Sequence, residues 1–239
     1  DSLPCVHGAV DYRGKREILS SAQLNLTRDD RSFVVTISGP AGAGKTTLIN
    51  NLALHLRDAS ILHFDSYRSV ARWWPNYLAL GMSPEQAARQ WLQDGADPNE
   101  YVTVPRMVED LRALLSGMSI STPEDWPIGT QHVKPARYIL VEDPWSRMRD
   151  ELAPFINFAV YVDTPLDYAL CRRLLRDHES GLDVVAVISK YVEVRERDYY
   201  ERHLRLRDHA DFVVDGMLAP EEMGLIVTRQ VREAAGEVM

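Results

Sequence analysis

The sequence predicts an α/β fold, with a parallel five-stranded sheet and helices on both of its faces. Five short apolar runs recur along the chain, and segments with helical spacing of apolar side chains lie between them. Parallel strands need crossover connections, and these are usually helices. The expected strands are residues 33–37, 60–64, 137–143, 158–163 and 211–215. Functional side chains are then expected beyond the carboxyl ends of the strands.

The expected helices follow from apolar residues that share one face. Residues 45–57 carry three leucines at steps of four, and residues 104–116 place their valine, methionine and leucine side chains on one side. A helix is also expected to begin near Ser83, because Pro84 suits a first helical position. Residues 117–136 are expected to form a loop.

Length and composition limit the classes of protein to consider. The chain has 239 residues, of which 45% are hydrophobic and 26% charged, as in ordinary folded proteins. Its apolar runs are shorter than a membrane-spanning helix requires, and a net charge of -8 disfavours a general nucleic-acid binder. Two cysteines are too few for a disulfide framework. We therefore expect a cytoplasmic protein with no membrane or nucleic-acid partner.

A glycine-rich turn joins the first expected strand to the first expected helix. It reads Gly39-Pro-Ala-Gly-Ala-Gly44-Lys45-Thr46 and fits the pattern G-x-x-x-x-G-K-[ST], the phosphate-binding P-loop. Backbone N–H groups of such a loop point at phosphate oxygens, and the helix N-terminus adds positive charge. The pattern predicts a P-loop NTPase fold that binds ATP and Mg²⁺, with Lys45 on the β- and γ-phosphates and Thr46 on the metal. The expected nucleotide-binding residues are Gly39, Ala41, Gly42, Ala43, Gly44, Lys45, Thr46 and Thr47.

Acidic residues at strand ends are the candidates for chemistry. Asp65, after the second strand, is expected to accept a proton from an attacking hydroxyl. Glu142 is expected to hold Mg²⁺, directly or through a water, with its neighbour Asp143 as the rival for that role. Asp163 is expected to cap the helix that follows it, and His63 to be a packed or hydrogen-bonded side chain.

A helix over residues 166–177 carries Arg172, Arg173 and Arg176, and a break at residues 178–181 follows it. Arginines on a closing lid would neutralise charge on a transferred phosphoryl group and exclude water. The alternative is a solvated helix face with Arg/Asp pairs. Residues 195–207 are expected to form a solvated helix with opposite charges along it.

The chain resembles the P-loop kinase family of the uridine-cytidine kinases, with phosphoribulokinase and type I pantothenate kinase as more distant relatives. The resemblance implies that Asp65 is the catalytic carboxylate, Glu142 the carboxylate associated with the metal, and Arg173 and Arg176 the lid arginines. It also implies ATP as the donor and the 5′-hydroxyl of a nucleoside, or a similar primary alcohol, as the acceptor. The stretches that carry the resemblance are residues 39–47, 139–142, 161–177, 189–191 and 209–214.

The resemblance also suggests how the domain is organised. Residues 1–31 would form an N-terminal extension and residues 32–239 the kinase domain, with an acceptor-covering insertion at about 66–136 and a lid at about 172–185. The residues expected to contact the acceptor are Asp65, Tyr67, Arg68, Asp97 and Trp126.

The acceptor side departs from the family pattern. The family's usual glycine after the metal acid is replaced by Asp143, and the lid has no arginine in residues 178–183. The expected function is ATP-dependent phosphorylation of a small molecule, most simply a nucleoside. The alternatives are a kinase of an antibiotic, sugar or vitamin precursor, and, from another class, a nucleotide-dependent switch or ATPase. A homo-oligomer is compatible with the sequence.

Overall fold

The computed structural model describes most of the segment Ser32–Met239, which forms one compact unit. The extension predicted at residues 1–31, and the start of the helix expected near Ser83, lie outside the described residues. The described residues are 32–67, 80–82, 86, 104–123, 129–179, 184–185, 188–189, 191–192 and 202–237.

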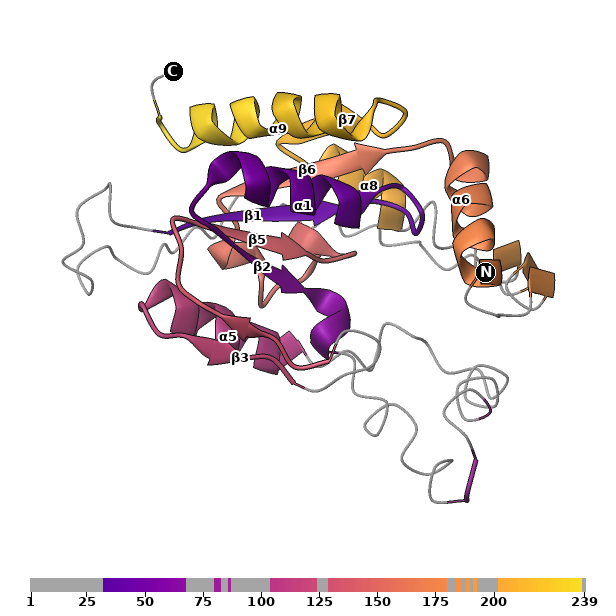
Figure 1. The fold of residues 1–239 in the computed structure, drawn as a ribbon, viewed down its shortest axis with the longest axis horizontal. Coiled ribbons are helices and arrows are strands. Elements are labelled where there is room, and N and C mark those ends of the chain that lie inside the picture. Colours follow the sequence, from indigo (N-terminus) through magenta and orange to yellow (C-terminus); the bar gives the residue numbers. More distant parts are fainter. Residues whose placement is uncertain are drawn as a thin grey trace, which may run out of the picture. The chain divides into compact units, whose positions relative to one another are not determined.

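The five predicted strands form one parallel sheet, and the expected fold class is confirmed. The strand order is β2-β5-β1-β6-β7, so the first strand lies at the centre (Figure 1). Each strand begins and ends within two residues of the range expected from the sequence. The strands are β1 (Phe33–Ser38), β2 (Ala59–His63), β5 (Tyr138–Glu142), β6 (Phe158–Asp163) and β7 (Phe212–Asp215).

Helices cover both faces of the sheet because successive strand residues point to opposite sides. Val35 packs with α1 (Lys45–Leu56) and α9 (Pro220–Ala234) in one buried cluster. Its neighbour Val34 packs with α5 (Val104–Leu115) in a second cluster. Figure 1 shows α1 and α9 on one side of the sheet and α5 on the other. The sequence interpretation did not include α9.

Shorter elements connect these layers. The segment expected as a loop, residues 117–136, contains an antiparallel pair of two-residue strands. The arginine-bearing helix is confirmed and extends two residues beyond the predicted end at residue 177. The remaining elements are η1 (Phe64–Tyr67), β3 (Ile120–Ser121), β4 (His132–Val133), η2 (Ser146–Met148), η3 (Ala153–Phe155), α6 (Leu166–Glu179) and α8 (Leu204–Asp208).

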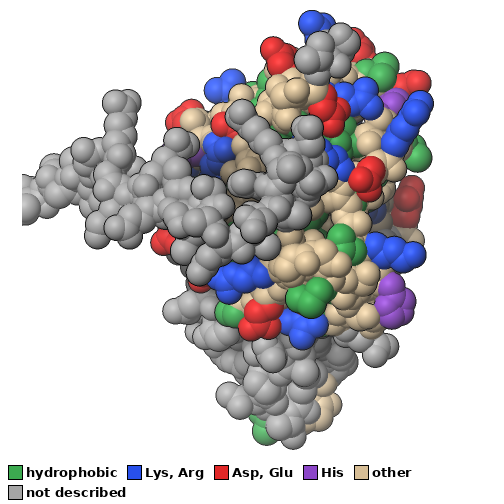
Figure 2. Space-filling model, turned by 90° about the vertical axis from the view of Figure 1, so that its left-hand side faces the viewer, with side chains coloured by type: hydrophobic (Ala, Val, Ile, Leu, Met, Phe, Trp, Pro, Cys, Tyr) green, Lys and Arg blue, Asp and Glu red, His purple; other side chains and the backbone are tan. Residues whose placement is uncertain are grey.

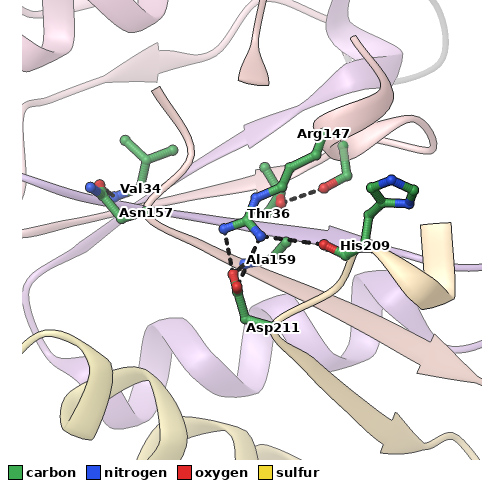
Figure 3. A network of polar contacts seen from close by, with 8 residues as sticks. Val34, Thr36, Arg147, Asn157, Ala159, His209 and Asp211 are labelled. Carbon is green, nitrogen blue, oxygen red and sulfur yellow. Dashed lines mark hydrogen bonds and ion pairs between the residues drawn. The ribbon is translucent and has the colours of Figure 1, made fainter. Parts of the chain in front are cut away.

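A polar network ties the loop after β5 to the segment before β7 (Figure 3). Arg147 in η2 donates to the carboxylate of Asp211, with Nη1 at 2.9 Å from Oδ1, and to the carbonyl of His209. Asp211 also accepts the backbone N–H of Ala159 in β6 at 2.8 Å. The network therefore holds η2 beside β6 and the start of β7.

The surface mixes charges of both signs. On the face in Figure 2, the described Lys and Arg side chains lie among Asp and Glu side chains, and hydrophobic side chains occur in small separate places. Within the described ranges, no helix has the length and apolar character needed to cross a membrane.

Candidate active site

The phosphate loop, residues 39–47, lies between β1 and α1 and has the backbone shape that its glycines predict. Gly42 and Gly44 have φ angles of 86° and 98°, which L side chains rarely adopt. A Cβ on Gly42 would lie 2.1 Å from the carbonyl oxygen of Ala169 in α6, whereas a Cβ on Gly44 would meet nothing within 4 Å. The loop is therefore packed against α6 on one side and open on the other.

The amino end of α1 is available to an anion. Gly44 is its N-cap, and no side chain caps the helix, so its first N–H groups are not used by a capping residue. The loop is closed by the N–H of Ala43, which donates to the carbonyl of Pro40 at 3.1 Å, and Lys45 Nζ donates to the same oxygen at 3.0 Å. The same turn holds the other predicted nucleotide-binding residues, Gly39, Ala41, Thr46 and Thr47.

Burial and nearby charges both affect the ammonium group of Lys45. Its pKa is lowered, chiefly because the ammonium is removed from water. The carboxylates of Glu142 and Asp65 oppose that shift, and the guanidinium groups of Arg176 and Arg202 add to it. The predicted site residue Glu142 lies beside the phosphate loop through its contact with Thr46, and the predicted residue Asp65 follows its other partner, His63, by two residues.

Glu142 is held by partners on both sides. Thr46 Oγ1 donates to its two carboxylate oxygens at 2.9 and 3.1 Å. On the other side, His63 Nδ1 lies 2.9 Å from Oε2, because the parallel register of β2 and β5 sets the two residues opposite each other. Burial favours the protonated form of Glu142, but the bonds from His63 and Thr46 and the charge of Lys45 hold its pKa below the ordinary value. Glu142 is therefore a carboxylate at neutral pH.

Asp65 and Tyr67 lie in η1, directly after β2, rather than at the end of the strand itself. The Tyr67 ring is 1% exposed, and its hydroxyl donates to Asp110 in α5 at 3.0 Å. Burial and the Asp110 carboxylate raise the pKa of that hydroxyl. On this geometry Tyr67 fastens η1 to α5, and its contact with the acceptor stays a prediction. Three other predicted acceptor residues, Arg68, Asp97 and Trp126, lie outside the described residues.

Asp143, the predicted rival to Glu142, is engaged in the loop that follows β5. It is fully buried, accepts the N–H of Ser146 at 2.7 Å and lies 3.0 Å from Nε of Arg149. Burial raises the pKa of its carboxyl, and the guanidinium of Arg149 opposes that change. Asp143 thus shapes residues 143–149, whereas Glu142 faces Thr46.

The two predicted lid arginines share one partner on α6. Asp177, which is buried, accepts from Nε of Arg173 at 3.2 Å and from Arg176 at 3.0 Å. The side chains of Arg173 and Arg176 are 38% and 64% exposed, so solvent reaches part of each side chain. The predicted lid boundary at residue 185 falls in a segment that is only partly described.

One segment differs from the solvated helix expected at residues 195–207. Within its described part, His203 and Leu206 are buried, and the guanidinium of Arg202 lies over the ring of Trp145 at 4.7 Å. The alternation of charges in this segment concealed its contact with the site. Asp163 differs too: its carboxylate lies 3.0 Å from Nε of Arg207, where a helix cap was expected.

Comparison with known proteins agrees with this geometry. The model of the phosphoribulokinase / uridine kinase family matches residues 34–219. A uridine kinase of Chlamydia pneumoniae is 25% identical over 211 residues, covering 84% of this chain and 89% of that protein. A uridine kinase of Deinococcus deserti is 29% identical, covering 70% of this chain and 80% of that protein. A solved structure from Silicibacter sp. TM1040 has a TM-score of 0.58 at 20% identity, covering 78% of this chain and 91% of that one.

The family match spans the sheet, the phosphate loop and the arginine helix, so it covers every element of the site described above. Sequence, fold and site therefore agree on a kinase that uses a nucleotide and a small-molecule acceptor. The chain belongs to the phosphoribulokinase / uridine kinase family and is a phosphotransferase with a hydroxyl group as acceptor.

Proposed function

We propose that this chain transfers the γ-phosphoryl group of ATP, with Mg²⁺ bound, to the 5′-hydroxyl of a nucleoside, as a uridine kinase does. The curated relatives support the nucleoside, since the chain covers 80% or more of the uridine kinases from Chlamydia and Deinococcus. The observation that carries the proposal is the contact of Thr46, in the phosphate loop, with Glu142 at 2.9 Å, together with Asp65, which follows the other partner of Glu142, His63, by two residues. Phosphoryl transfer to an alcohol uses a lysine that binds phosphate, a carboxylate that holds the metal and a second carboxylate that accepts the proton of the hydroxyl. Lys45, Glu142 and Asp65 are the candidates for these three roles.

The donor half of the mechanism belongs to the phosphate loop. Its open amides and the amino end of α1 suit the phosphates, and Lys45 would turn from the carbonyl of Pro40 to the terminal phosphate oxygens. Mg²⁺, when bound, would neutralise phosphate charge, and the oxygens of Thr46 and Glu142 are the hard ligands that it prefers. Thr46 Oγ1 and Glu142 Oε1 already lie 2.9 Å apart, so both oxygens could bind the same Mg²⁺ ion.

The acceptor half belongs to Asp65 and the arginines. Asp65 would accept the proton of the attacking hydroxyl and hold its oxygen toward the phosphorus. The guanidinium groups of Arg173 and Arg176, whose side chains are partly exposed, would stabilise negative charge on the transferred group. Most of the rate enhancement would come from positioning and electrostatics, as in other phosphoryl transfers.

An acceptor panel tests this proposal. Purified protein is supplied with ATP and Mg²⁺, and turnover is measured with uridine, cytidine, purine nucleosides, sugars and other primary alcohols. We expect the highest kcat/KM with a pyrimidine nucleoside, and the product to carry phosphate at the 5′-oxygen. A Lys45→Gln variant serves as the inactive control. Turnover confined to a non-nucleoside alcohol would overturn the nucleoside assignment.

A second acceptor class has one observation in its favour. Asp143 replaces the glycine that the family usually carries beside the metal acid, and its buried pair with Arg149 occupies the loop next to the site. A change in this loop would alter the neighbouring acceptor site, and it would then suit a different alcohol, such as a sugar, an antibiotic or a vitamin precursor. The same acceptor panel separates the two classes.

A further inference from the structure

Four side chains form an alternating stack across the carboxyl edge of the sheet. The guanidinium of Arg149 lies 4.8 Å from the ring centre of Phe64 and 5.7 Å from that of Trp145. The guanidinium of Arg202 lies 4.7 Å from the same Trp145 ring. We call Phe64, Arg149, Trp145 and Arg202 the cation–π stack. It joins three segments that are far apart in the sequence.

The stack lies beside the candidate active site. Phe64 directly precedes Asp65, and Asp143, the partner of Arg149, directly follows Glu142. At the other end, Arg202 is one of the charges that act on Lys45. Arg149 is therefore anchored between the backbone positions that carry the two proposed functional acids.

Among the described residues, a buried donor of Arg149 has no partner. Its side chain is 9% exposed, and Nε is occupied by Asp143 at 3.0 and 3.1 Å. Its Nη2 is buried, and in the described part of the chain no acceptor lies within hydrogen-bonding distance. Buried donors are normally satisfied, because leaving one unpaired forfeits its hydration. An unpaired donor beside an active site is explained if the substrate supplies the acceptor.

We propose that Arg149 is an acceptor-specificity residue whose Nη2 donates a hydrogen bond to a neutral carbonyl oxygen of the substrate. This inference rests on the proposed function and names the group that the acceptor presents. Asp143 already neutralises the charge of Arg149, so a second anion at Nη2 would be buried without a countercharge of its own. A carbonyl oxygen, such as those on a pyrimidine ring, satisfies the donor and adds no charge.

The test compares two acceptors in wild type and variants. One is uridine, and the other is a riboside whose ring carries no carbonyl oxygen. We expect wild type to favour uridine, and Arg149→Lys to lower kcat/KM for uridine by about tenfold to a hundredfold while changing the second acceptor little. The loss should appear in the KM of the acceptor, with the KM of ATP unchanged.

Two further variants keep the test decisive. Asp143→Asn combined with Arg149→Gln removes both charges, so no buried ion is left alone if Arg149→Lys folds poorly. Arg147→Gln is the matched control, because this arginine is two residues away and pairs with Asp211 outside the site. It should leave the ratio of the two acceptors unchanged. An equal loss for both acceptors, or a lower Tm with an unchanged ratio, would overturn the role of Arg149.

The outcome also separates this inference from the proposed function. If the acceptor panel selects a non-nucleoside alcohol, the nucleoside assignment fails, and the variants are then measured with that alcohol and with its analogue lacking the carbonyl oxygen. Selective loss for the carbonyl-bearing form would support Arg149. A preferred acceptor without any carbonyl oxygen would contradict it.

Discussion

The donor side and the acceptor side of this site are built in different ways. The donor side is one stretch of chain, residues 39–47, whose shape comes from backbone angles and from the start of a helix. The metal-associated acid and the acceptor side instead depend on side chains that are distant in sequence: His63 and Glu142 are 79 residues apart, and Tyr67 and Asp110 are 43 apart. The donor side is therefore a local structure, and the acceptor side exists only when the sheet and α5 are assembled.

This difference determines how amino-acid substitutions should affect the two sides of the site. A local loop tolerates no side chain where its backbone is crowded, but its function does not depend on remote partners. An assembled surface can alter its selectivity through single side chains, because contacts that lie far apart and share no partner contribute almost independently. Substitutions in the phosphate loop should therefore impair stability and nucleotide binding, whereas substitutions on the acceptor side should impair turnover or acceptor selectivity.

The largest effect on turnover is expected on the acceptor side. Asp65→Asn removes the proposed proton acceptor and should lower kcat by about two to four orders of magnitude. Nucleotide binding should stay within about twofold, because the phosphate loop supplies those contacts. Steady-state kinetics and nucleotide titration by calorimetry measure the two quantities. Glu109→Gln, on the exposed surface of α5, is the control. Equal loss of nucleotide binding would erase the distinction between the two sides.

The next effect concerns the donor side. Gly42→Ala places a Cβ 2.1 Å from the backbone oxygen of Ala169, which cannot move aside as a flexible side chain would. We expect the free energy of unfolding to fall by about 3 kcal/mol or more, together with loss of nucleotide binding. Gly44→Ala shares the positive φ but meets open space, so it should cost only about 1–2 kcal/mol. Chemical denaturation measures the free energy of unfolding of both variants. Similar losses of stability in the two would show that the close approach of Ala169 does not matter.

His63 stands where the two sides meet, and its variant should show a moderate effect. His63→Asn withdraws the group that orients Glu142, so the Mg²⁺ concentration for half-maximal turnover should rise by about tenfold. Direct titration with the metal and nucleotide, without acceptor, gives a second reading. His132→Asn in β4 is the control, since that residue lies on the exposed hairpin. An unchanged metal requirement would show that Thr46 alone positions Glu142.

The smallest effect on turnover is expected for Tyr67→Phe. Asp110 is 5% exposed and would lose a donor, so the variant should lose about 1–2 kcal/mol of stability. Tyr138→Phe is the matched comparison, because its partner Glu237 is 39% exposed and can be solvated instead. We expect the Tm to fall more for Tyr67→Phe. A large change in acceptor KM would instead return Tyr67 to the direct role that the sequence predicts.

The individual strands, α1 and the phosphate loop could be predicted because neighbouring residues determine them, and the parallel sheet followed from the alternation of strands with helices. A β-branched run followed by G-x-x-x-x-G-K-T specifies strand, turn and helix within a few residues. Asp65 and Glu142 could be predicted as candidates because they follow apolar runs. Their functional roles stay predictions until the variants are measured.

The contacts across the site could not be predicted because they depend on strand pairing. Nothing in the local sequence sets His63 against Glu142, since β2 and β5 pair across a long insertion. Asp143 was a plausible metal ligand until its burial against Arg149 was seen. Arg202 was concealed in a segment rich in opposite charges. An acid at the position of a small residue, with an arginine six residues later, was the available signal for the Asp143 pair.

The close approach at Gly42 also links two parts of the molecule mechanically. The carbonyl of Ala169 rests where a side chain would be, so the nucleotide loop and the first turns of α6 touch backbone to backbone. A displacement of the loop would therefore shift the backbone of the helix that bears Arg173 and Arg176, because no side chain lies between Gly42 and Ala169 to absorb it.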